Sequence, residues 1–133
     1  MKTIKILMIC LFVFTVSTKL SAQSADIPAE IISALDDGNA ARINAQLSAN
    51  VELVVGNIND VFSKQQASGI ISDFFQSLKV HSFQLIHKGN KDAASFAIGT
   101  LKTSEGNYRV YVLTRKQGAA ALIQQLRIES SNE

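Results

Sequence analysis

The sequence predicts an α+β fold in which N-terminal helices pack on one face of a curved, mostly antiparallel sheet. Helical apolar patterns occupy the region from about residue 27 to residue 78, apart from a strand-like interval, and four strand-like runs follow residue 80. Turn signals containing glycine separate those runs. No repeat, low-complexity tract or linker divides this part of the chain, so we expect one domain over residues 23–133.

The first 22 residues have the layout of a secretory signal peptide. Lys2 and Lys5 precede an apolar run from Ile6 to Val16, and a polar stretch leads from there to Ala22. The apolar run is too short to span a bilayer. We therefore expect cleavage after Ala22 and export to the periplasm or the cell exterior, with no membrane span. The alternative reading of this segment is a short buried helix.

Loss of the leader changes the charge and the cysteine content. The full chain has 13 basic and 11 acidic residues, and Lys2, Lys5 and Lys19 would leave with the leader, which gives a mature net charge of −1. A basic protein that binds nucleic acid is therefore not expected. The single cysteine, Cys10, would also be lost, so the mature chain would contain neither a disulfide nor a thiolate ligand.

An apolar stripe at helical spacing predicts the first helix, around residues 27–35. We expect Asp26 to cap this helix, Pro28 to lie in its first turn, and Gly38 to follow its end in a left-handed conformation. Asn39 is then the expected cap of a second short helix.

The second helix should extend to about Ser48 and be followed by a strand at 51–55 and an extended piece around Val61. The next helix has the clearest signal in the chain. Ser63 and Gln66 fit a capping box, and the apolar positions that follow keep a strict helical period: Ala67, Ile70, Ile71, Phe74, Phe75 and Leu78.

The remaining chain predicts an antiparallel meander. Its strand-like runs are residues 82–88, 94–103, 107–116 and 120–129, with turns expected at 88–91, 104–107 and 116–118. In the middle of the sheet, Val110 and Val112 alternate with Tyr111 and Leu113, so both faces are apolar. Helices can cover only one face. The other face is expected to be a dimer surface or a pocket wall, unless it carries only scattered exposed apolar side chains.

The order of these elements resembles the nuclear-transport-factor-2-like superfamily, whose fold is cystatin-like and cone-shaped. The likeness lies in the stretches IPAEIISALDDGN, VELVV, SKQQASGIISDFF, FAIGTLKTSEGNYRVYVL and LIQQLRIE. The chain is most similar to the domain-of-unknown-function 4783 family of small exported Bacteroidota proteins. This resemblance implies a fold and a compartment but no activity, because the superfamily contains isomerases, dehydratases and hydrolases beside non-catalytic binding and dimerising modules.

Arg109 is the most conspicuous candidate for ligand binding, because it lies within an otherwise apolar strand. Two-residue turns at 105–106 and 117–118 would place Thr100, Tyr111 and Gln124 in one cross-strand row on the same face. Together with Arg109 these side chains could bind an anion or a carboxylate. The alternative is a rim arginine that covers apolar surface and pairs with an acid.

The other titratable candidate is His87, which alternation places on the same strand face as Phe83 and Leu85. This pattern favours a structural histidine in the core or at the sheet edge over a catalytic one. Two histidines without cysteine or a metal-binding spacing predict no metal site, and the isolated turn glycines predict no phosphate loop, so no cofactor is expected.

These observations favour an exported, non-catalytic domain that binds a small apolar ligand or an envelope protein partner through a cone pocket or sheet face. We expect it to form a homodimer through its sheet. The competing hypothesis is a small isomerase or hydrolase for a hydrophobic substrate, with His87 or Tyr111 as acid or base; the predicted strands lack the carboxylate that such chemistry favours. A third possibility is a structural accessory of an envelope complex.

Overall fold

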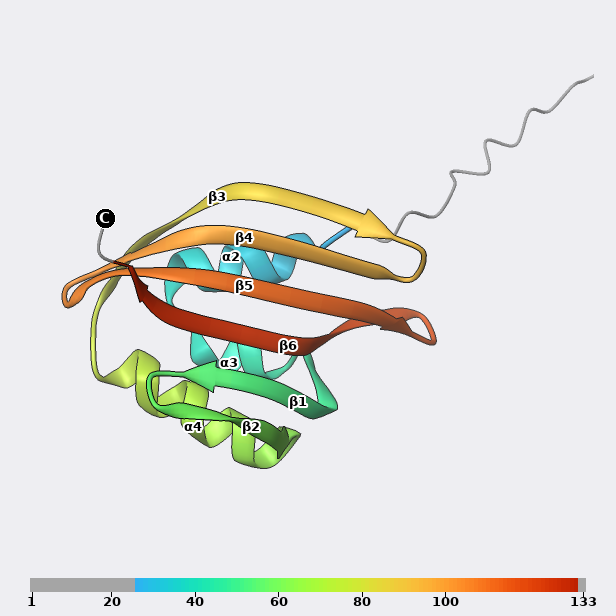
Figure 1. Ribbon diagram of the computed structural model, residues 1–133, viewed down its shortest axis with the longest axis horizontal. Helices are drawn as coiled ribbons and strands as arrows, with labels where there is room; N and C mark the ends of the chain where they lie inside the picture. The colour runs from blue at the N-terminus through green and yellow to red at the C-terminus, as the bar shows by residue number, and fades with distance from the viewer. Residues whose placement is uncertain (1–25, 132–133) are drawn as a thin grey trace, which may run out of the picture.

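A curved sheet with helices on one face forms the part of the chain that the structure describes (Figure 1). The structure is a computed structural model, and it describes residues 26–131; the predicted leader and the cleavage after Ala22 lie outside this range. The strand order is β2-β1-β6-β5-β4-β3, with β1 and β6 parallel and the other neighbours antiparallel. The predicted fold class is confirmed. The elements are α2 Ala29–Asp37, α3 Ala40–Asn44, β1 Leu47–Val55, β2 Ile58–Ser63, α4 Lys64–Gln76, β3 Val80–Lys91, β4 Ala94–Thr103, β5 Gly106–Gln117 and β6 Ala120–Ser131.

Helix α2 begins two residues later than expected. Pro28 is the N-cap residue rather than a first-turn residue, and no side chain caps the helix. Asp26, the expected cap, instead accepts a long hydrogen bond from Asn90 Nδ2 at 3.4 Å. At the other end, Gly38 has φ 63 and ψ 32, so the left-handed C-terminal residue is confirmed.

Helix α3 is shorter than the sequence predicts. Asn39 caps it as expected, accepting from the Arg42 backbone N–H at 3.1 Å. The helix ends at Asn44, however, and Leu47 already belongs to β1, paired with Ile123 of β6. A helix to Ser48 was therefore wrong: Leu47 has the spacing of a helical stripe, but its partner is a strand far along the sequence.

Arg42 ties α3 to α2. Its guanidinium donates to both carboxylate oxygens of Glu30, at 2.7 and 3.0 Å, and to Asp37 at 2.7 Å. These donated hydrogen bonds lower the pKa of the Glu30 carboxyl below its ordinary value. The cluster is exposed, so solvent screens it. The contacts link two short helices at the surface.

The capping box and the apolar stripe of α4 are confirmed. Ser63 accepts from the Gln66 backbone N–H at 3.2 Å, while the Gln66 side chain accepts from the Ser63 backbone N–H at 3.2 Å. Ala67, Ile71 and Phe75 of the stripe are buried. The remaining stripe residues, Ile70, Phe74 and Leu78, pack on the margin of the core.

Apolar side chains fill the space between helices and sheet. Helix α2 packs on β3, and α4 packs on β1 and β2 at the other side of the sheet. Between them, residues of α2, α3, α4 and the inner sheet face form one buried cluster that includes Leu35, Ile43, Val110 and Leu126, all fully buried. The inner face of the sheet is therefore mainly core.

One turn and one strand face of β3 differ from expectation. The predicted turn at 88–91 lies inside β3, where Phe96 covers Gly89, and the reversal occurs at Asp92, which has φ 56. An irregularity between Leu85 and His87 then reverses the alternation of β3. His87 is consequently exposed and on the opposite face from Leu85, so the prediction that they share a face was wrong.

A second irregularity changes the register between β5 and β6. Thr114 pairs with Ile123 but Leu113 pairs with Gln125, so Gln124 is the extra residue of a bulge. Every β6 residue after Gln124 is therefore displaced from the partner that a two-residue turn would give it. As a result, Tyr111 faces Arg127 instead of Gln124.

Candidate functional site

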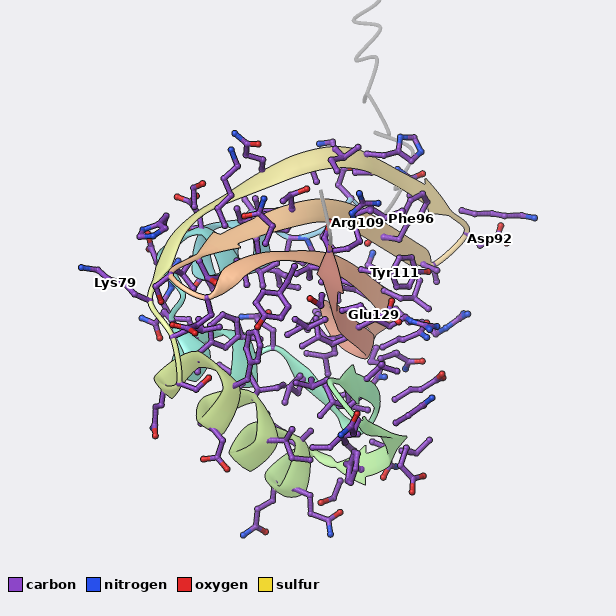
Figure 2. All side chains as sticks on the ribbon, turned by 60° about the vertical axis from the view of Figure 1, so that its left-hand side comes forward. Lys79, Asp92, Phe96, Arg109, Tyr111 and Glu129 are labelled. Atoms are coloured by element: carbon purple, nitrogen blue, oxygen red, sulfur yellow. The ribbon has the colours of Figure 1, made fainter. Side chains whose placement is uncertain are left out.

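The face of the sheet turned away from the helices carries large side chains that remain partly exposed. Phe96 and Ile98 of β4 and Tyr111 and Leu113 of β5 are half-buried there, while their sequence neighbours on the inner face are buried. We call these four residues the outer patch. Figure 2 shows Phe96 and Tyr111 over β4 and β5, with Lys79 and Asp92 at opposite ends of the molecule. The prediction of apolar residues on both faces is thus confirmed.

Aromatic contacts order the outer patch across three strands. The Phe96 ring stacks with the Tyr111 ring at a centroid distance of 6.2 Å and an interplanar angle of 23°. On its other side, the His87 ring lies 5.4 Å from Phe96 at 56°. Phe96 therefore separates the imidazole from the phenol, and the two groups proposed as acid or base do not contact each other through their rings.

An open cleft of about 390 Å³ lies next to the outer patch. Arg127 Nη2 lies 3.8 Å from Glu129 Oε2, a weak and exposed ion pair. Gln125 Nε2 donates to Glu52 Oε2 of β1 at 3.2 Å. Both charge signs therefore meet on this face. The lining of this outer cleft is Ile98, Arg109, Tyr111, Gln125, Arg127 and Glu129.

Arg109 is not at an edge of the sheet, because β5 lies between β4 and β6. Its neighbours in register are Thr100 and Glu129. Lys102 pairs with Asn107, because the β4–β5 turn lies at residues 104–105 rather than at the expected 105–106. The Arg109 side chain is half-buried and lines the outer cleft together with Tyr111.

The structure brings some of the predicted site residues together and separates others. Thr100, Arg109 and Tyr111 share the outer face of β4 and β5. Gln124 occupies the β6 bulge and does not line the outer cleft, and His87 lies beyond Phe96 on β3. Ligand binding by these residues stays a prediction.

Three further polar residues line the outer cleft: Gln125, Arg127 and Glu129. Sequence reasoning offers Arg127 and Gln125 as weaker ligand candidates, and of the three it missed only Glu129. Two-residue turns imply regular pairing along β6 and would place Gln125 and Arg127 on the opposite face of the sheet from Tyr111. The spacing of apolar residues in β6 is the signal that could have revealed the bulge. Ile123, Leu126 and Ile128 are buried on one face, but the first two are three residues apart and the last two are two apart. A regular strand places residues on one face at a spacing of two, so an extra residue must lie between Ile123 and Leu126.

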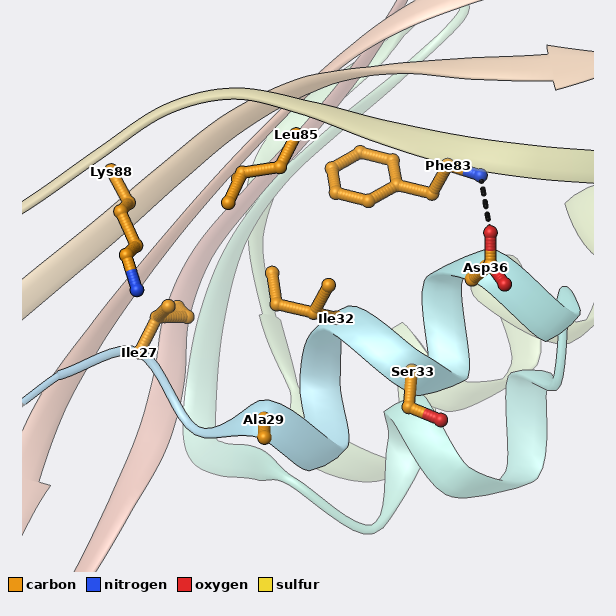
Figure 3. Close-up of a pocket in the computed structure, with 8 residues that line it drawn as sticks. All are labelled: Ile27, Ala29, Ile32, Ser33, Asp36, Phe83, Leu85 and Lys88. Carbon is orange, nitrogen blue, oxygen red and sulfur yellow. Dashed lines mark hydrogen bonds between the residues drawn. The ribbon is translucent and has the colours of Figure 1, made fainter.

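A second, separate cleft of about 460 Å³ lies between α2 and β3 (Figure 3). Asp36 closes one end, where its Oδ1 accepts a hydrogen bond from the Phe83 backbone N–H at 2.9 Å. Lys88 stands at the other end. We call it the edge cleft, and its lining is Ile27, Ala29, Ile32, Ser33, Asp36, Phe83, Leu85 and Lys88.

The groups available for chemistry are few in residues 26–131. The polar side chains buried in this range are Ser48, Ser95, Thr103 and Thr114. The hydroxyls of Ser95 in β4 and Thr114 in β5 hydrogen-bond to each other at 2.6 Å. Within the same residues no carboxylate or imidazole is buried. The described side chains contain no group of three or more acidic, histidine or cysteine residues that could hold a metal ion. Nor does any described helix have the length and apolarity needed to cross a bilayer.

The arrangement of helices on one face of a curved sheet assigns the protein to a known fold class. The fold is that of nuclear-transport-factor-2-like proteins: a variant of the solved protein Rd1NTF2_05 superposes with a TM-score of 0.61, covering 75% of this chain and 90% of that chain. The identity of 16% means that this likeness shows the fold alone. No curated protein matches the chain.

The chain belongs to the family described as "Domain of unknown function (DUF4783)", whose model matches residues 28–129. A DUF4783 family protein from Bacteroides ovatus is 36% identical, with a TM-score of 0.77 over 80% of this chain and 97% of that chain. One from Bacteroides fragilis is 38% identical, with a TM-score of 0.75 over 80% and 100%. The predicted resemblance to this family and to its superfamily is confirmed.

Proposed function

We propose that this protein is an exported, non-catalytic binding module that associates with a second copy of itself through the outer face of its sheet. The observation that carries this proposal is the outer patch: four large, half-buried side chains on the adjacent interior strands β4 and β5. Apolar side chains that remain partly exposed in the middle of a sheet are typical of an interaction surface.

The packing of the inner face favours the outer face as the binding surface. Core side chains of the helices meet fully buried residues such as Leu101 and Val112. A ligand in the middle of the cone would have to displace this core, and emptying a packed site costs several kcal/mol. The outer patch requires no such rearrangement.

Charge on the outer face supports a second copy as the partner. In a two-fold symmetric dimer both copies use the same surface. If a residue of one copy contacts a second residue on its partner, the same pair of residues therefore also meets with the roles of the two copies exchanged. Arg127 and Glu129 lie on this face together. A face that has both a guanidinium and a carboxylate beside an apolar centre is complementary to itself.

The distribution of titratable groups supports the proposal that the protein is not an enzyme. A general base works best within hydrogen-bond reach of a substrate held in a dry pocket. In the described residues His87 is exposed and Glu129 is exposed, and neither lies in an enclosed space. The two arginines of the outer cleft suit binding and pairing rather than proton transfer.

The oligomeric state tests this proposal. Sedimentation equilibrium of residues 23–133 should give a dimer at high micromolar concentration. Ile98→Glu should raise the dissociation constant at least about tenfold, which corresponds to about 1.4 kcal/mol, because it buries an unpaired carboxylate in the interface. Lys79→Glu is the matched control: it also changes charge, but at one end of the molecule (Figure 2), and should leave the constant unchanged.

A charge exchange sharpens the test. Arg127→Glu and Glu129→Arg should each weaken the dimer, and the double variant should restore part of the loss, since the pairs are reciprocal across a two-fold axis. A wild-type monomer at high micromolar concentration would overturn the proposal. A monomer that retains a small molecule in native mass spectrometry, and loses it in Ile98→Glu, would replace it with ligand binding.

Export has its own measurement. We expect expression of the full chain in a Gram-negative host to yield a periplasmic or secreted product that begins at Gln23. The reason is the basic start, short apolar run and small residue at Ala22. Intact mass spectrometry reads the cleavage site directly. A cytoplasmic product that retains residues 1–22 would exclude export by this leader. Ala22→Arg should block cleavage if the leader is cut after residue 22.

A further inference from the structure

The edge cleft has a polar group of opposite charge at each end and an apolar middle. Figure 3 shows the Lys88 side chain next to Ile27 at one end and Asp36 next to Phe83 at the other, with Ile32 and Leu85 between them. Helix α2 also begins at the Lys88 end without a side-chain cap. The first amides of a helix attract anions, so this end favours a carboxylate and the Asp36 end favours an ammonium group.

Strand β3 offers backbone groups along the same cleft. It is the last strand of the sheet and pairs only with β4 in the order of strands. The Phe83 N–H points away from β4, because it donates to Asp36 of α2. The Gln84 carbonyl points the opposite way, since a Cβ built on Gly99 of β4 would lie 2.5 Å from it. Leu85 follows the direction of Phe83 by strand alternation, so its backbone faces the open edge.

The apolar residues at this edge are unusually accessible. Leu85 is 41% exposed, and Ile86, at the irregularity of β3, is 57% exposed. Edge strands of soluble proteins are usually protected by charge, proline or a covering element, because an apolar open edge recruits another chain. Here α2 protects the Phe83 end and leaves Leu85 open. The combination indicates a place where an extended chain adds to the sheet.

We infer that the edge cleft binds a short apolar peptide with free termini, running parallel to β3. The peptide ammonium lies at Asp36, its carboxylate at Lys88, and its backbone hydrogen-bonds to Leu85 while its side chains contact Ile27 and Ile32. From residue 83 to residue 88 a strand extends roughly 15 Å at about 3.3 Å per residue, the reach of three or four extended residues. The cleft volume of about 460 Å³ is in the range of small-molecule sites.

A peptide accounts for more of the cleft than a fatty carboxylate does. A hydrocarbon chain with one carboxylate would use Lys88 and the apolar middle, but it would leave the negative Asp36 end and the open Leu85 backbone unused. Strand addition obtains affinity from main-chain hydrogen bonds and specificity from side-chain contacts. This inference does not depend on self-association through the outer patch, because the two sites lie on different faces of the molecule.

The test uses the tripeptide Leu-Ala-Leu in a two-dimensional amide NMR titration of residues 23–133. The free peptide should shift the amides of residues 27–36 and 83–88. Its N-acetylated and C-amidated forms should each bind at least about tenfold more weakly, because each loses one charge pair. Lys88→Glu should weaken the free peptide similarly, and Lys102→Glu, on the outer face of β4, is the control that should not.

Asp36→Asn tests the ammonium end without removing the acceptor for the Phe83 N–H. It should weaken the free tripeptide but leave the affinity of the acetylated form unchanged. Ala29→Phe should block the cleft sterically, with the fold checked by circular dichroism. Equal binding of free and acetylated peptides would overturn the inference, as would shifts confined to the outer face or binding of decanoate instead of the peptide. Ile98→Glu should keep peptide binding, which separates this result from the outcome of the dimer test.

Discussion

Replacement of Phe75 by alanine is expected to lower the free energy of unfolding by about 3–5 kcal/mol. Phe75 is 7% exposed and belongs to the core cluster through which α4 covers the sheet. Its ring meets Phe74 edge to face at a centroid distance of 5.0 Å. Truncation would remove the transfer free energy of the ring and leave a cavity that the two flanking layers cannot close. Urea denaturation followed by circular dichroism measures the loss.

Two neighbours serve as controls for Phe75→Ala. Gln76→Ala changes an exposed residue of the same helix and should alter stability by less than about 0.5 kcal/mol. Phe74→Ala should cost less than Phe75→Ala, because Phe74 packs on the core margin against Tyr108 with part of its ring in solvent. A loss below about 1 kcal/mol for Phe75→Ala would contradict the packing of α4 on the sheet.

Gly99→Ala is expected to destabilise the protein by about 1–3 kcal/mol, the range of overpacked cores. A Cβ on Gly99 would lie 2.5 Å from the Gln84 carbonyl oxygen and 2.7 Å from Phe83 Cε1. The carbonyl belongs to the adjacent strand β3, so relief of the clash requires the two strands to separate. Thermal unfolding and urea denaturation both report this effect.

The matched control is Gly69→Ala. Gly69 lies in α4 with open space around its Cβ position, and alanine there should stabilise the helix by up to about 1 kcal/mol. The same substitution thus has opposite signs at two positions. Phe83→Leu combined with Gly99→Ala should restore only part of the lost stability, because the contact with the carbonyl remains. If Gly99→Ala were as stable as the wild type, β3 would have to lie farther from β4 at this point.

The helices were the most predictable part of the fold, because their signals are local. Ser63 and Gln66 are three residues apart and mark the start of α4 without reference to the rest of the chain. Gly38 likewise marks the end of α2 by its own conformational freedom. The end of α3 was not predictable in this way. Leu47 belongs to β1 because of Ile123, and no local pattern reports a partner that distant.

The outer cleft was predictable only in part for the same reason. Arg109 and Tyr111 lie two apart on one strand, so strand alternation places them on the same face regardless of register. Arg127 joins them because the bulge at Gln124 displaces β6 by one residue. Whether the strand forms a bulge or pairs regularly depends on which register packs better on the two faces of the sheet. A local sequence pattern does not contain this information.

The position of β6 has a consequence for biosynthesis. Residues 120–131 form the strand that joins β1 to β5, although they are the last segment of the sheet to leave the ribosome. Until then the nascent polypeptide holds two separate half-sheets, with residues such as Leu53 and Val112 lacking the strand beside them. A stalled or truncated translation product that lacks residues 120–131 would expose these half-sheets to aggregation and proteolysis.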